Sequence, residues 1–213
     1  MTRTIAARAL LFDADGVLVD SDASVASAWT RWARRWDLDP ATVLPMVHGR
    51  RSADTVTLLI APVDRERALA EINRFEVEDA VGVTPCPGAA ALLDQLPTNA
   101  WAVVTSGTRQ LAVARLAAAG LPAPAVLVTA DDVPRGKPDP AGYLLAAESL
   151  GVDATDCVVF EDSPAGIAAG IAAGAVVIGV SERARDSDAA VVVEDLSDVR
   201  WDSGVIRCCS NSP

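Results

Sequence analysis

Two aspartates, Asp13 and Asp15, directly follow the apolar run Ala9–Phe12. Side chains alternate between the two faces of an extended chain, so residues two positions apart begin on the same face. Gly16 then permits a sharp turn of the backbone. Two carboxylates held this close repel each other unless a cation or a proton lies between them. The pattern therefore predicts a site for a hard metal ion, a shared proton, or both.

This pair is suited to the hydrolysis of a phosphate monoester. The uncatalysed reaction is very slow, and both the nucleophile and the phosphoryl group are anionic. Mg²⁺ can hold both of them, and it prefers an octahedral set of oxygen ligands. Asp13 can act as the nucleophile through an aspartyl-phosphate, while Asp15 can protonate the leaving oxygen and then activate water.

Further polar groups follow later predicted strands. Glu161 and Asp162 would complete the metal site. Ser106 and the backbone N–H of Gly107 open a helix whose N-terminus favours an anion. Lys137, the only lysine of the chain, would neutralise the remaining phosphoryl charge as a compact point charge. Each feature alone is common in turns and helix starts, whereas their conjunction in this order is specific.

The second half of the chain predicts the elements that must position these groups. From about residue 98, apolar β-branched runs alternate with Ala-rich stretches, which is typical of an α/β fold with a parallel sheet covered on both faces. In such sheets ligands bind at the carboxyl ends of the strands. We expect strands at 8–13, 101–105, 125–129, 157–160, 175–180 and 189–193, and helices at 109–119, 140–150 and 165–173.

The segment between the first strand and the rest of the sheet lacks clear strands. Its pattern predicts helices over 20–36, 53–60 and 64–80. Trp29, Trp32 and Trp36 recur at spacings of three and four on one helix face, and we interpret them as core residues. The segment is therefore predicted to be a helical insertion.

The composition limits the cellular environment and the binding partners that we expect for this protein. The chain has 213 residues, of which 51% are hydrophobic, and a net charge of −11. This acidic balance disfavours nucleic acid and anionic membranes as partners. Its four cysteines show neither metal-ligand spacing nor a disulfide framework, and no apolar run suits a signal peptide or a membrane span. We expect a cytoplasmic protein that is a monomer or a small homo-oligomer.

Four segments resemble the motifs of the haloacid dehalogenase superfamily. They are residues 13–21, 105–108, 136–140 and 160–166, and the resemblance covers residues from about 8 to 195. It implies a Rossmann-like catalytic core formed by residues 1–18 and 87–199, with a helical cap formed by residues 19–86. Residues 200–213 lose the pattern and are expected to form a flexible tail.

The same resemblance implies a role for each motif residue. Asp13 is then the nucleophile, Asp15 the acid and base, and Ser106, Gly107 and Lys137 bind the phosphoryl group. The implied Mg²⁺ ligands are Asp13, Asp15 through its carbonyl, Glu161 and Asp162.

Within the superfamily, Asp15 points to a phosphatase or a phosphomutase. Residues 48–51, 101–108 and 130–133 are similar to small sugar- and glycerol-phosphate phosphatases. The beta-phosphoglucomutases carry a cap histidine shortly after the first motif, where this chain has Val25. We therefore expect a Mg²⁺-dependent phosphatase acting on a small phosphorylated sugar or polyol, with a phosphomutase as the alternative.

Specificity is expected to lie in the cap. His48 and Arg51 are candidates for contact with the non-phosphate part of the substrate, and Arg109 is a candidate for a position near it. Glu76 and Glu78 could likewise bind sugar hydroxyls, but we favour a solvated helix face for both. The linkers at 17–20 and 84–88 are expected to let the cap open and close.

A signalling receiver module is an alternative of a different class. It also combines an acidic pair, a phospho-accepting aspartate, a Ser or Thr and a Lys on a parallel sheet. The late position of the second acidic pair and the helical insertion disfavour it. Such a module would stay phosphorylated for minutes and would not turn over sugar phosphates.

Overall fold

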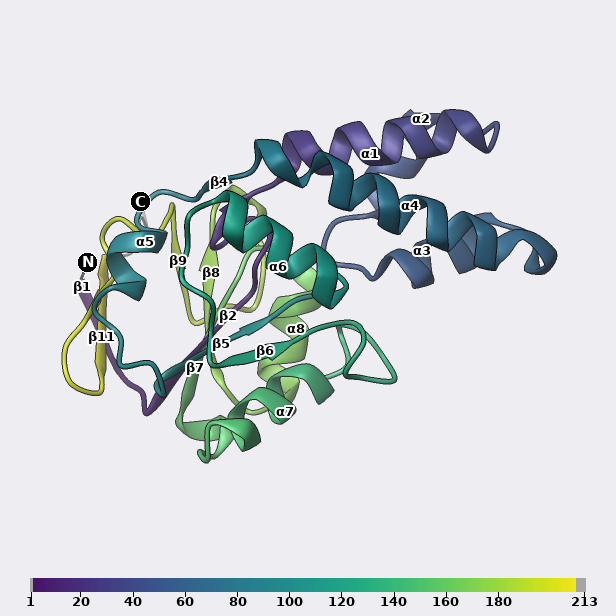
Figure 1. The fold of residues 1–213 in the computed structure, drawn as a ribbon. Helices are drawn as coiled ribbons and strands as arrows, with labels where there is room; N and C mark the ends of the chain where they lie inside the picture. The colour runs from purple at the N-terminus through teal and green to yellow at the C-terminus, as the bar shows by residue number, and fades with distance from the viewer. Residues whose placement is uncertain (1, 210–213) are drawn as a thin grey trace.

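A parallel six-stranded sheet forms the centre of the computed structural model, which describes residues 2–209 (Figure 1). The strand order is β6-β5-β2-β7-β8-β9. The strands are β2 (Ala9–Phe12), β5 (Trp101–Val104), β6 (Val126–Val128), β7 (Cys157–Glu161), β8 (Val176–Val180) and β9 (Val191–Val193). The predicted α/β fold is confirmed, and β2 lies at the centre of the sheet between β5 and β7.

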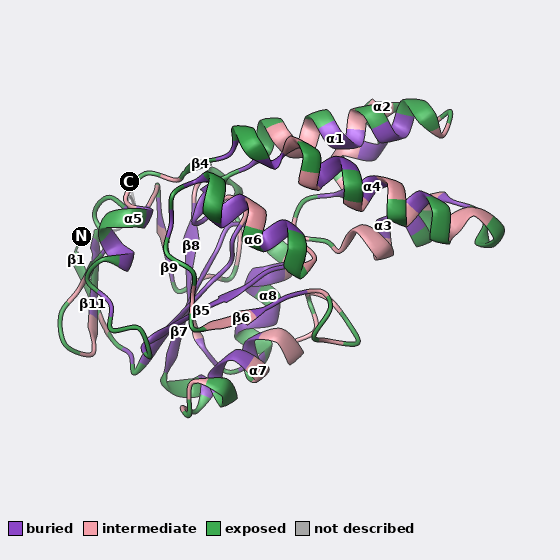
Figure 2. Ribbon diagram, in the orientation of Figure 1, coloured by how far each residue is buried: buried purple, intermediate pink, exposed green. Residues whose placement is uncertain are grey.

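Helices cover both faces of this sheet, and the alternation along β2 explains why both faces are apolar. Leu10 and Phe12 pack on the side of α5 and α6, while Ala9 and Leu11 pack on the side of α7 and α8. The central strands β2, β5 and β7 are accordingly buried along their whole length, whereas the edge strand β6 is partly exposed (Figure 2). The helices are α5 (Ala89–Leu93), α6 (Arg109–Ala118), α7 (Ala141–Ser149) and α8 (Pro164–Ala172).

Two of these helices begin at capping residues directly after the motif strands. The Thr108 side chain accepts a hydrogen bond from the backbone N–H of Leu111 at the start of α6. The Ser163 side chain does the same for Gly166 at the start of α8. Such caps satisfy N–H groups that have no partner within the helix. They fix where each helix starts relative to the site.

A second group of helices extends away from the sheet beyond α6 (Figure 1), and we call residues 22–82 the helical segment. It contains α1 (Asp22–Arg35), α2 (Pro40–Val43), α3 (Ser52–Leu59) and α4 (Arg65–Asp79). The segment has its own apolar core around Trp29 and Trp32, whose rings meet edge to face at 5.1 Å. Trp36 packs against this core, so the interpretation of the three tryptophans as core residues is confirmed.

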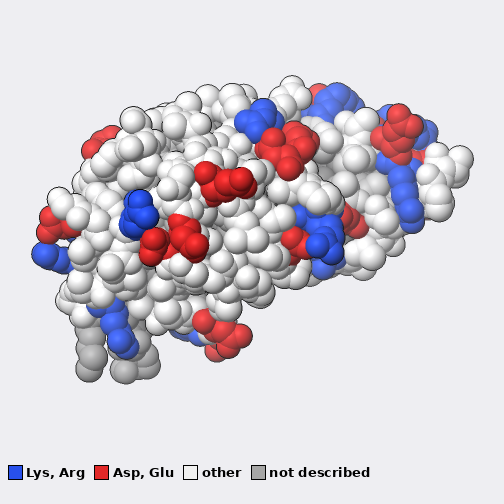
Figure 3. Space-filling model, turned by 90° about the horizontal axis from the view of Figure 1, so that it is seen from below, with Lys and Arg blue, Asp and Glu red and all other residues white. Residues whose placement is uncertain are grey.

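Short 3-10 turns complete the helical elements. They lie at Leu44–Met46, Pro62–Asp64 and Ala80–Gly82 in the helical segment, and at Ala154–Asp156 and Glu182–Ala184 in the rest of the chain. No helix among residues 2–209 combines the length and the apolar composition needed to cross a membrane. On the face seen in Figure 3, acidic and basic side chains lie interspersed.

The two connections to the helical segment run side by side. They pair as the antiparallel strands β3 (Val19–Asp20) and β4 (Thr84–Pro85). Gly88 follows β4 with φ of 80°, and a Cβ atom there would lie 2.1 Å from the carbonyl carbon of Leu196. Gly88 is therefore held against the neighbouring backbone, which leaves no room for a side chain.

The C-terminal residues form an element that the sequence pattern did not lead us to expect. The strands β1 (Thr2–Ala6), β10 (Arg200–Trp201) and β11 (Val205–Cys209) make a small antiparallel sheet. Ile206 and Cys208 of β11 are buried in the core on the α5 and α6 side. The expectation of a flexible tail is thus wrong for residues 200–209, because alternate side chains of β11 are buried in the core. Residues 210–213 lie outside the described residues.

Candidate active site

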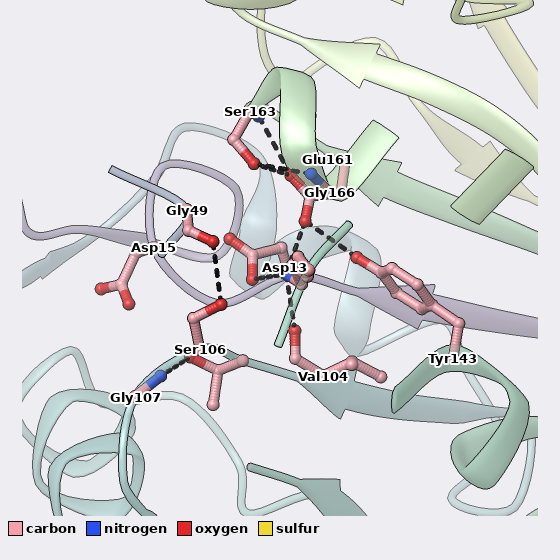
Figure 4. Close-up of polar contacts among 12 residues, drawn as sticks. Asp13, Asp15, Gly49, Val104, Ser106, Gly107, Tyr143, Glu161, Ser163 and Gly166 are labelled. Atoms are coloured by element: carbon pink, nitrogen blue, oxygen red, sulfur yellow. Dashed lines mark hydrogen bonds and ion pairs between the residues drawn. The ribbon is translucent and has the colours of Figure 1, made fainter. Parts of the chain in front are cut away.

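The motif residues meet at the carboxyl edge of the sheet (Figure 4). Asp13 follows β2, and Glu161 and Asp162 stand at the end of the neighbouring strand β7. Their carboxylate oxygens lie within 4.8 Å of one another. Ser106 follows β5, and Lys137 comes from the connection between β6 and α7.

Lys137 joins two of these carboxylates. Its Nζ donates hydrogen bonds to Asp13 Oδ1 and Glu161 Oε1, each at 2.5 Å, and to the Val104 carbonyl at 3.2 Å. Only 6% of the Lys137 side chain is exposed. Burial alone would lower the pKa of this ammonium, but Asp13, Glu161 and Tyr143 together hold it well above its usual value. Lys137 is therefore a fixed positive charge at the site.

Glu161 accepts hydrogen bonds at all four of its acceptor positions. Lys137 and the Tyr143 hydroxyl donate to Oε1, while the backbone N–H and the side-chain hydroxyl of Ser163 donate to Oε2. A carboxylate has about four such positions. Glu161 therefore holds Lys137 in place and has no free oxygen position in this arrangement for direct contact with a metal ion.

Asp13 and Asp162 keep one oxygen each that accepts no hydrogen bond from the described residues. Asp13 accepts only at Oδ1, from Lys137, and Asp162 accepts only at Oδ2, from Arg183 at 2.9 Å. Both residues are buried, and each offers a carboxylate oxygen within 4.8 Å of one from the other, which suits a hard divalent cation. Of the sequence-predicted ligands, these two fit the role directly.

The electrostatics of the cluster also favour a bound cation. Burial raises the pKa of Asp13 well above its usual value, and Glu161, Asp162 and Asp15 add to this effect against the opposing Lys137. Burial, together with Glu161, raises the pKa of Asp162 to about 6, although Arg183 and Lys137 oppose it. Crowded carboxylates without enough positive charge bind protons or cations more readily.

Gly16 brings the first and fourth motifs together. Its φ is 79°, which is a left-handed conformation that suits glycine. A Cβ atom at this position would lie 2.2 Å from Asp162 Oδ2. The turn after Asp15 therefore requires glycine both for its backbone conformation and for the space that Asp162 occupies.

Asp15 is not part of the metal-ligand cluster, and its carboxylate lies apart from those of Asp13 and Glu161 (Figure 4). Its Oδ1 accepts hydrogen bonds from Ser21 Oγ at 2.6 Å and from Arg115 Nη1 at 2.8 Å. A carboxyl group held in this way beside Asp13 is placed for proton transfer to a leaving group rather than for attack on phosphorus.

The two predicted phosphate donors already have partners. Ser106 Oγ donates to the Gly49 carbonyl of the helical segment at 3.0 Å, and the N–H of Gly107 donates to Thr105 Oγ1 at 3.1 Å. A phosphoryl group must replace these contacts in order to bind. The helical segment thus touches the site directly.

A pocket of about 50 Å³ lies between the sheet edge and the helical segment. Its walls combine site residues of both parts of the chain: Asp13, Asp15, Ser106, Arg115, Asp162 and Arg183 on one side, and Val25, Trp29, His48, Gly49, Arg50 and Glu76 on the other. The predicted candidate His48 therefore lies in the pocket wall. Burial and the nearby Arg183 lower the pKa of His48, while Asp22 and Asp15 oppose this, so the imidazole is neutral near pH 7.

Two other predicted contact residues lie elsewhere. Arg51 does not line this pocket; it binds Asp54 at 2.8 Å and the carbonyls of Val133 and Pro134, so it links the helical segment to the loop before Lys137. Arg109 binds Asp132 at 2.7 Å and the Leu127 carbonyl. Neighbouring loops bind both guanidinium groups outside this pocket, and contact of Arg51 or Arg109 with the substrate stays a prediction.

The prediction of a solvated position is wrong for Glu76. This residue is only 6% exposed, and its side chain accepts hydrogen bonds from Trp29 Nε1 at 3.3 Å and Ser52 Oγ at 2.9 Å. Burial raises the pKa of Glu76, against the lowering effects of Arg115, Ser52 and Trp29. Glu78 does lie on the surface, where it pairs with Arg31 and Arg74.

Arg115 is a pocket residue that the motifs did not reveal. It lies on the buried face of α6 with Leu111, Ala112 and Leu116. A signal was present in the sequence, because Arg115 stands four positions after Leu111 on an apolar stripe, as Glu76 stands four positions after Ile72. A charged residue within such a stripe must find a partner inside the protein.

Comparison with known proteins agrees with this geometry. A family model described as haloacid dehalogenase-like hydrolase matches residues 7–174. This chain belongs to the haloacid dehalogenase-like hydrolases. The resemblance predicted from the four motifs is thereby confirmed, and a receiver module is excluded.

Among the haloacid dehalogenase-like hydrolases, several similar proteins are named as phosphatases. Hexitol phosphatase A of Escherichia coli (strain K12) is 46% identical over 179 residues, which are 82% of this chain and 83% of that protein. Glycerol-1-phosphate phosphohydrolase 2 of Saccharomyces cerevisiae is 36% identical over 188 residues, covering 81% of this chain and 74% of that protein.

A solved structure shares the fold. The beta-phosphoglucomutase of Clostridium difficile superimposes with a TM-score of 0.79 at 22% identity, covering 92% of this chain and 94% of that one. At this identity the likeness concerns the architecture of the sheet and its helices.

Proposed function

We propose that this hydrolase is a Mg²⁺-dependent phosphatase that acts on a small phosphorylated sugar or polyol through a phosphorylated Asp13. The observation that carries the proposal is the free oxygen of Asp13, which lies in a buried carboxylate cluster beside the fixed charge of Lys137. The names of the similar phosphatases support the substrate class.

Asp13 and Asp162 would hold the metal ion directly, because both are buried in one carboxylate cluster and each keeps an oxygen that accepts no hydrogen bond from the described residues. Glu161 would support the site by fixing Lys137. When bound, Mg²⁺ supplies the positive charge that lets an anionic nucleophile approach an anionic phosphoryl group.

The residues of this chain then perform two displacements. Asp13 attacks phosphorus, the bond to the ester oxygen breaks, and Asp15 donates its proton to that oxygen. Lys137 and Ser106 bind the phosphoryl oxygens. Asp15 next removes a proton from water as the water oxygen attacks phosphorus, which releases phosphate and frees Asp13. Ser21 and Arg115 keep the Asp15 carboxylate in position throughout.

Two observations favour hydrolysis over phosphate transfer between two positions of one sugar. The similar proteins Hexitol phosphatase A and Glycerol-1-phosphate phosphohydrolase 2 are named as enzymes that release phosphate. Val25 contributes an apolar group to the wall, and the only histidine of the chain, His48, lies further along the helical segment.

Phosphate release from a panel of phosphorylated metabolites, with Mg²⁺ and with a chelator, tests the proposal. We expect release from sugar or polyol phosphates that requires the metal ion and is abolished in Asp13→Asn. Metal-independent hydrolysis, or conversion of a hexose 1-phosphate into the 6-phosphate without free phosphate, would contradict it.

A further inference from the structure

A buried pair of opposite charges spans the junction between the helical segment and the sheet. Glu76 comes from α4 and Arg115 from α6, and these two helices pack against each other. The two residues are 6% and 3% exposed, respectively. Both line the pocket that also contains Asp13 and Asp15.

The pair is held slightly apart. Arg115 Nη2 lies 3.8 Å from Glu76 Oε1, which is longer than a hydrogen bond. Among residues 2–209, Nε and Nη2 of Arg115 are buried without any hydrogen-bond partner. Buried polar groups are nearly always hydrogen-bonded, so these two donors indicate a place for a ligand or water.

Glu76 offers acceptors beside these donors. Its Oε1 accepts one hydrogen bond from Trp29 and its Oε2 accepts one from Ser52. Each carboxylate oxygen can accept about two hydrogen bonds, so one position remains on each. The pocket wall therefore presents a free donor of Arg115 beside free acceptor positions of Glu76. Trp29 and Ser52 hold the Glu76 carboxylate in place.

We propose that Glu76 and Arg115 bind a hydroxyl group of the substrate and make this hydrolase select phosphate esters whose alcohol part is neutral and polyhydroxylated. This assignment rests on the proposed phosphatase function. A hydroxyl is complementary to the pair because it accepts from the Arg115 N–H and donates to Glu76 at the same time. A carboxylate or a second phosphate has only acceptors when ionised, and it would face the charge of Glu76.

The connection to Asp15 specifies which hydroxyl is bound. Arg115 Nη1 donates to Asp15 Oδ1 at 2.8 Å, while the free Nη2 of the same guanidinium faces Glu76. Asp15 protonates the ester oxygen in the proposed mechanism. One end of the guanidinium therefore contacts Asp15, the group that serves the ester oxygen, and the other end faces Glu76. Since one guanidinium is small, we assign the bound hydroxyl to a carbon close to the ester carbon.

The wild-type enzyme provides the first test. We compare kcat/KM for glycerol 1-phosphate with that for propyl phosphate, which has the same carbon chain without hydroxyls, and for 2-phosphoglycolate, which carries a carboxylate next to the ester carbon and no hydroxyl. We expect a preference for glycerol 1-phosphate of about 100-fold or more over both, because a site that hydrogen-bonds a hydroxyl leaves buried groups unpaired with an analogue that lacks it.

Variants then test whether Glu76 and Arg115 cause the preference for glycerol 1-phosphate. Glu76→Gln should reduce the ratio of kcat/KM for glycerol 1-phosphate to that for propyl phosphate by about tenfold or more, since it weakens a charge-assisted hydrogen bond. Glu78→Gln is the matched control on the same helix, because Glu78 pairs with arginines on the surface, and it should leave both rates unchanged. Thermal unfolding confirms that each variant is folded.

The outcomes separate the two proposals. Equal use of glycerol 1-phosphate and propyl phosphate by the wild type overturns the hydroxyl site while the phosphatase function stands. An unchanged ratio in folded Glu76→Gln overturns the assignment to Glu76. Lack of phosphate release from every ester, including p-nitrophenyl phosphate, overturns both. If Glu76→Gln does not fold, the wild-type comparison decides.

Discussion

Lys137 donates a hydrogen bond to Asp13 across 124 positions of sequence, at a distance of 2.5 Å. Both side chains are almost fully buried. Because each charge has been removed from water, the pair depends on its own geometry and on the groups around it. The contact therefore links the proposed nucleophile to the stability of the sheet edge.

Replacing Lys137 with methionine should destabilise the protein in the absence of metal. Asp13 and Glu161 would then lie close together in a buried space without the ammonium between them. Loss of one partner of a buried ion pair costs about 3–5 kcal/mol. Chemical denaturation measures the free energy of unfolding, and Mg²⁺ should restore part of the loss. Equal stability of the two proteins without metal would contradict this account.

Asp13→Asn should abolish turnover and leave the fold intact. The amide keeps the size of the side chain but cannot form an acyl phosphate by the same route, so phosphate release should fall by about 10⁴-fold or more. Circular dichroism serves as the control for folding. Hydrolysis at the wild-type rate would show that another group attacks phosphorus.

Mg²⁺ affinity should decrease as the pH falls below about 6. Burial and Glu161 raise the pKa of Asp162 to about 6, so below this pH the ion must displace a proton from its ligand. The apparent affinity should fall by up to about tenfold per pH unit there. Calorimetric titration at pH 5, 6 and 7 measures it, and equal affinities at pH 5 and 7 would contradict the role of Asp162.

The same raised pKa predicts the sign of an effect on stability without metal. The folded protein binds the Asp162 proton more tightly than the unfolded chain, whose carboxyl has an ordinary pKa of about 3.9. The stabilisation from this group is therefore complete below about pH 4 and is lost as the pH rises to about 6. Denaturation with a chelator present, across this range, should show the decrease.

The helical segment should move away from the sheet edge to admit substrate. The pocket of about 50 Å³ has room for only a few water molecules, and the Ser106 hydroxyl donates its hydrogen bond to the Gly49 carbonyl instead of to a phosphoryl group. We expect small-angle scattering of the free protein to give a larger radius of gyration than Mg²⁺ with vanadate gives. Identical profiles would indicate that substrate enters without movement of the segment.

Arg109→Ala should have little effect on catalysis. Its guanidinium binds Asp132 and the Leu127 carbonyl at an exposed site outside the pocket. We expect kcat and KM within about twofold of the wild type and a loss of stability of about 1 kcal/mol or less. A large increase in KM would return Arg109 to the substrate site.

Much of the site could be predicted because parallel strands bring their carboxyl ends to one edge. Asp13, Ser106 and Asp162 each follow a strand with a recognisable apolar run, so their meeting required only the correct topology. Lys137 was identified by its rarity and its neighbouring residues. These features are local in the sequence.

The residues that were missed depend on packing between distant helices. Glu76 is buried because α4 lies against α6, and the sequence of α4 alone does not show which helix covers it. Arg109 and Arg115 lie on the same helix, but only Arg115 is on the face that is turned inward. Choosing between them requires knowledge of that face.

The C-terminal strand was missed for a different reason. In β11, buried Ile206 and Cys208 alternate with exposed Arg207 and Cys209, which is the pattern of a strand with one buried face. The partner of β11 is β1, about 200 residues away in the chain, where Thr2 pairs with Cys209. The pattern was readable, but the pairing is non-local.

Lys137 carries the single side-chain amine of the sequence, and that amine is enclosed by two carboxylates. An acylating reagent such as a succinimidyl ester therefore has one lysine to modify, and it can reach this lysine only when the enclosure opens. Because the α-amine of the chain reacts as well, the mass added to the proteolytic peptide that contains Lys137 would report these openings over time. Native chemistry thus provides a reporter of site access that needs no introduced label.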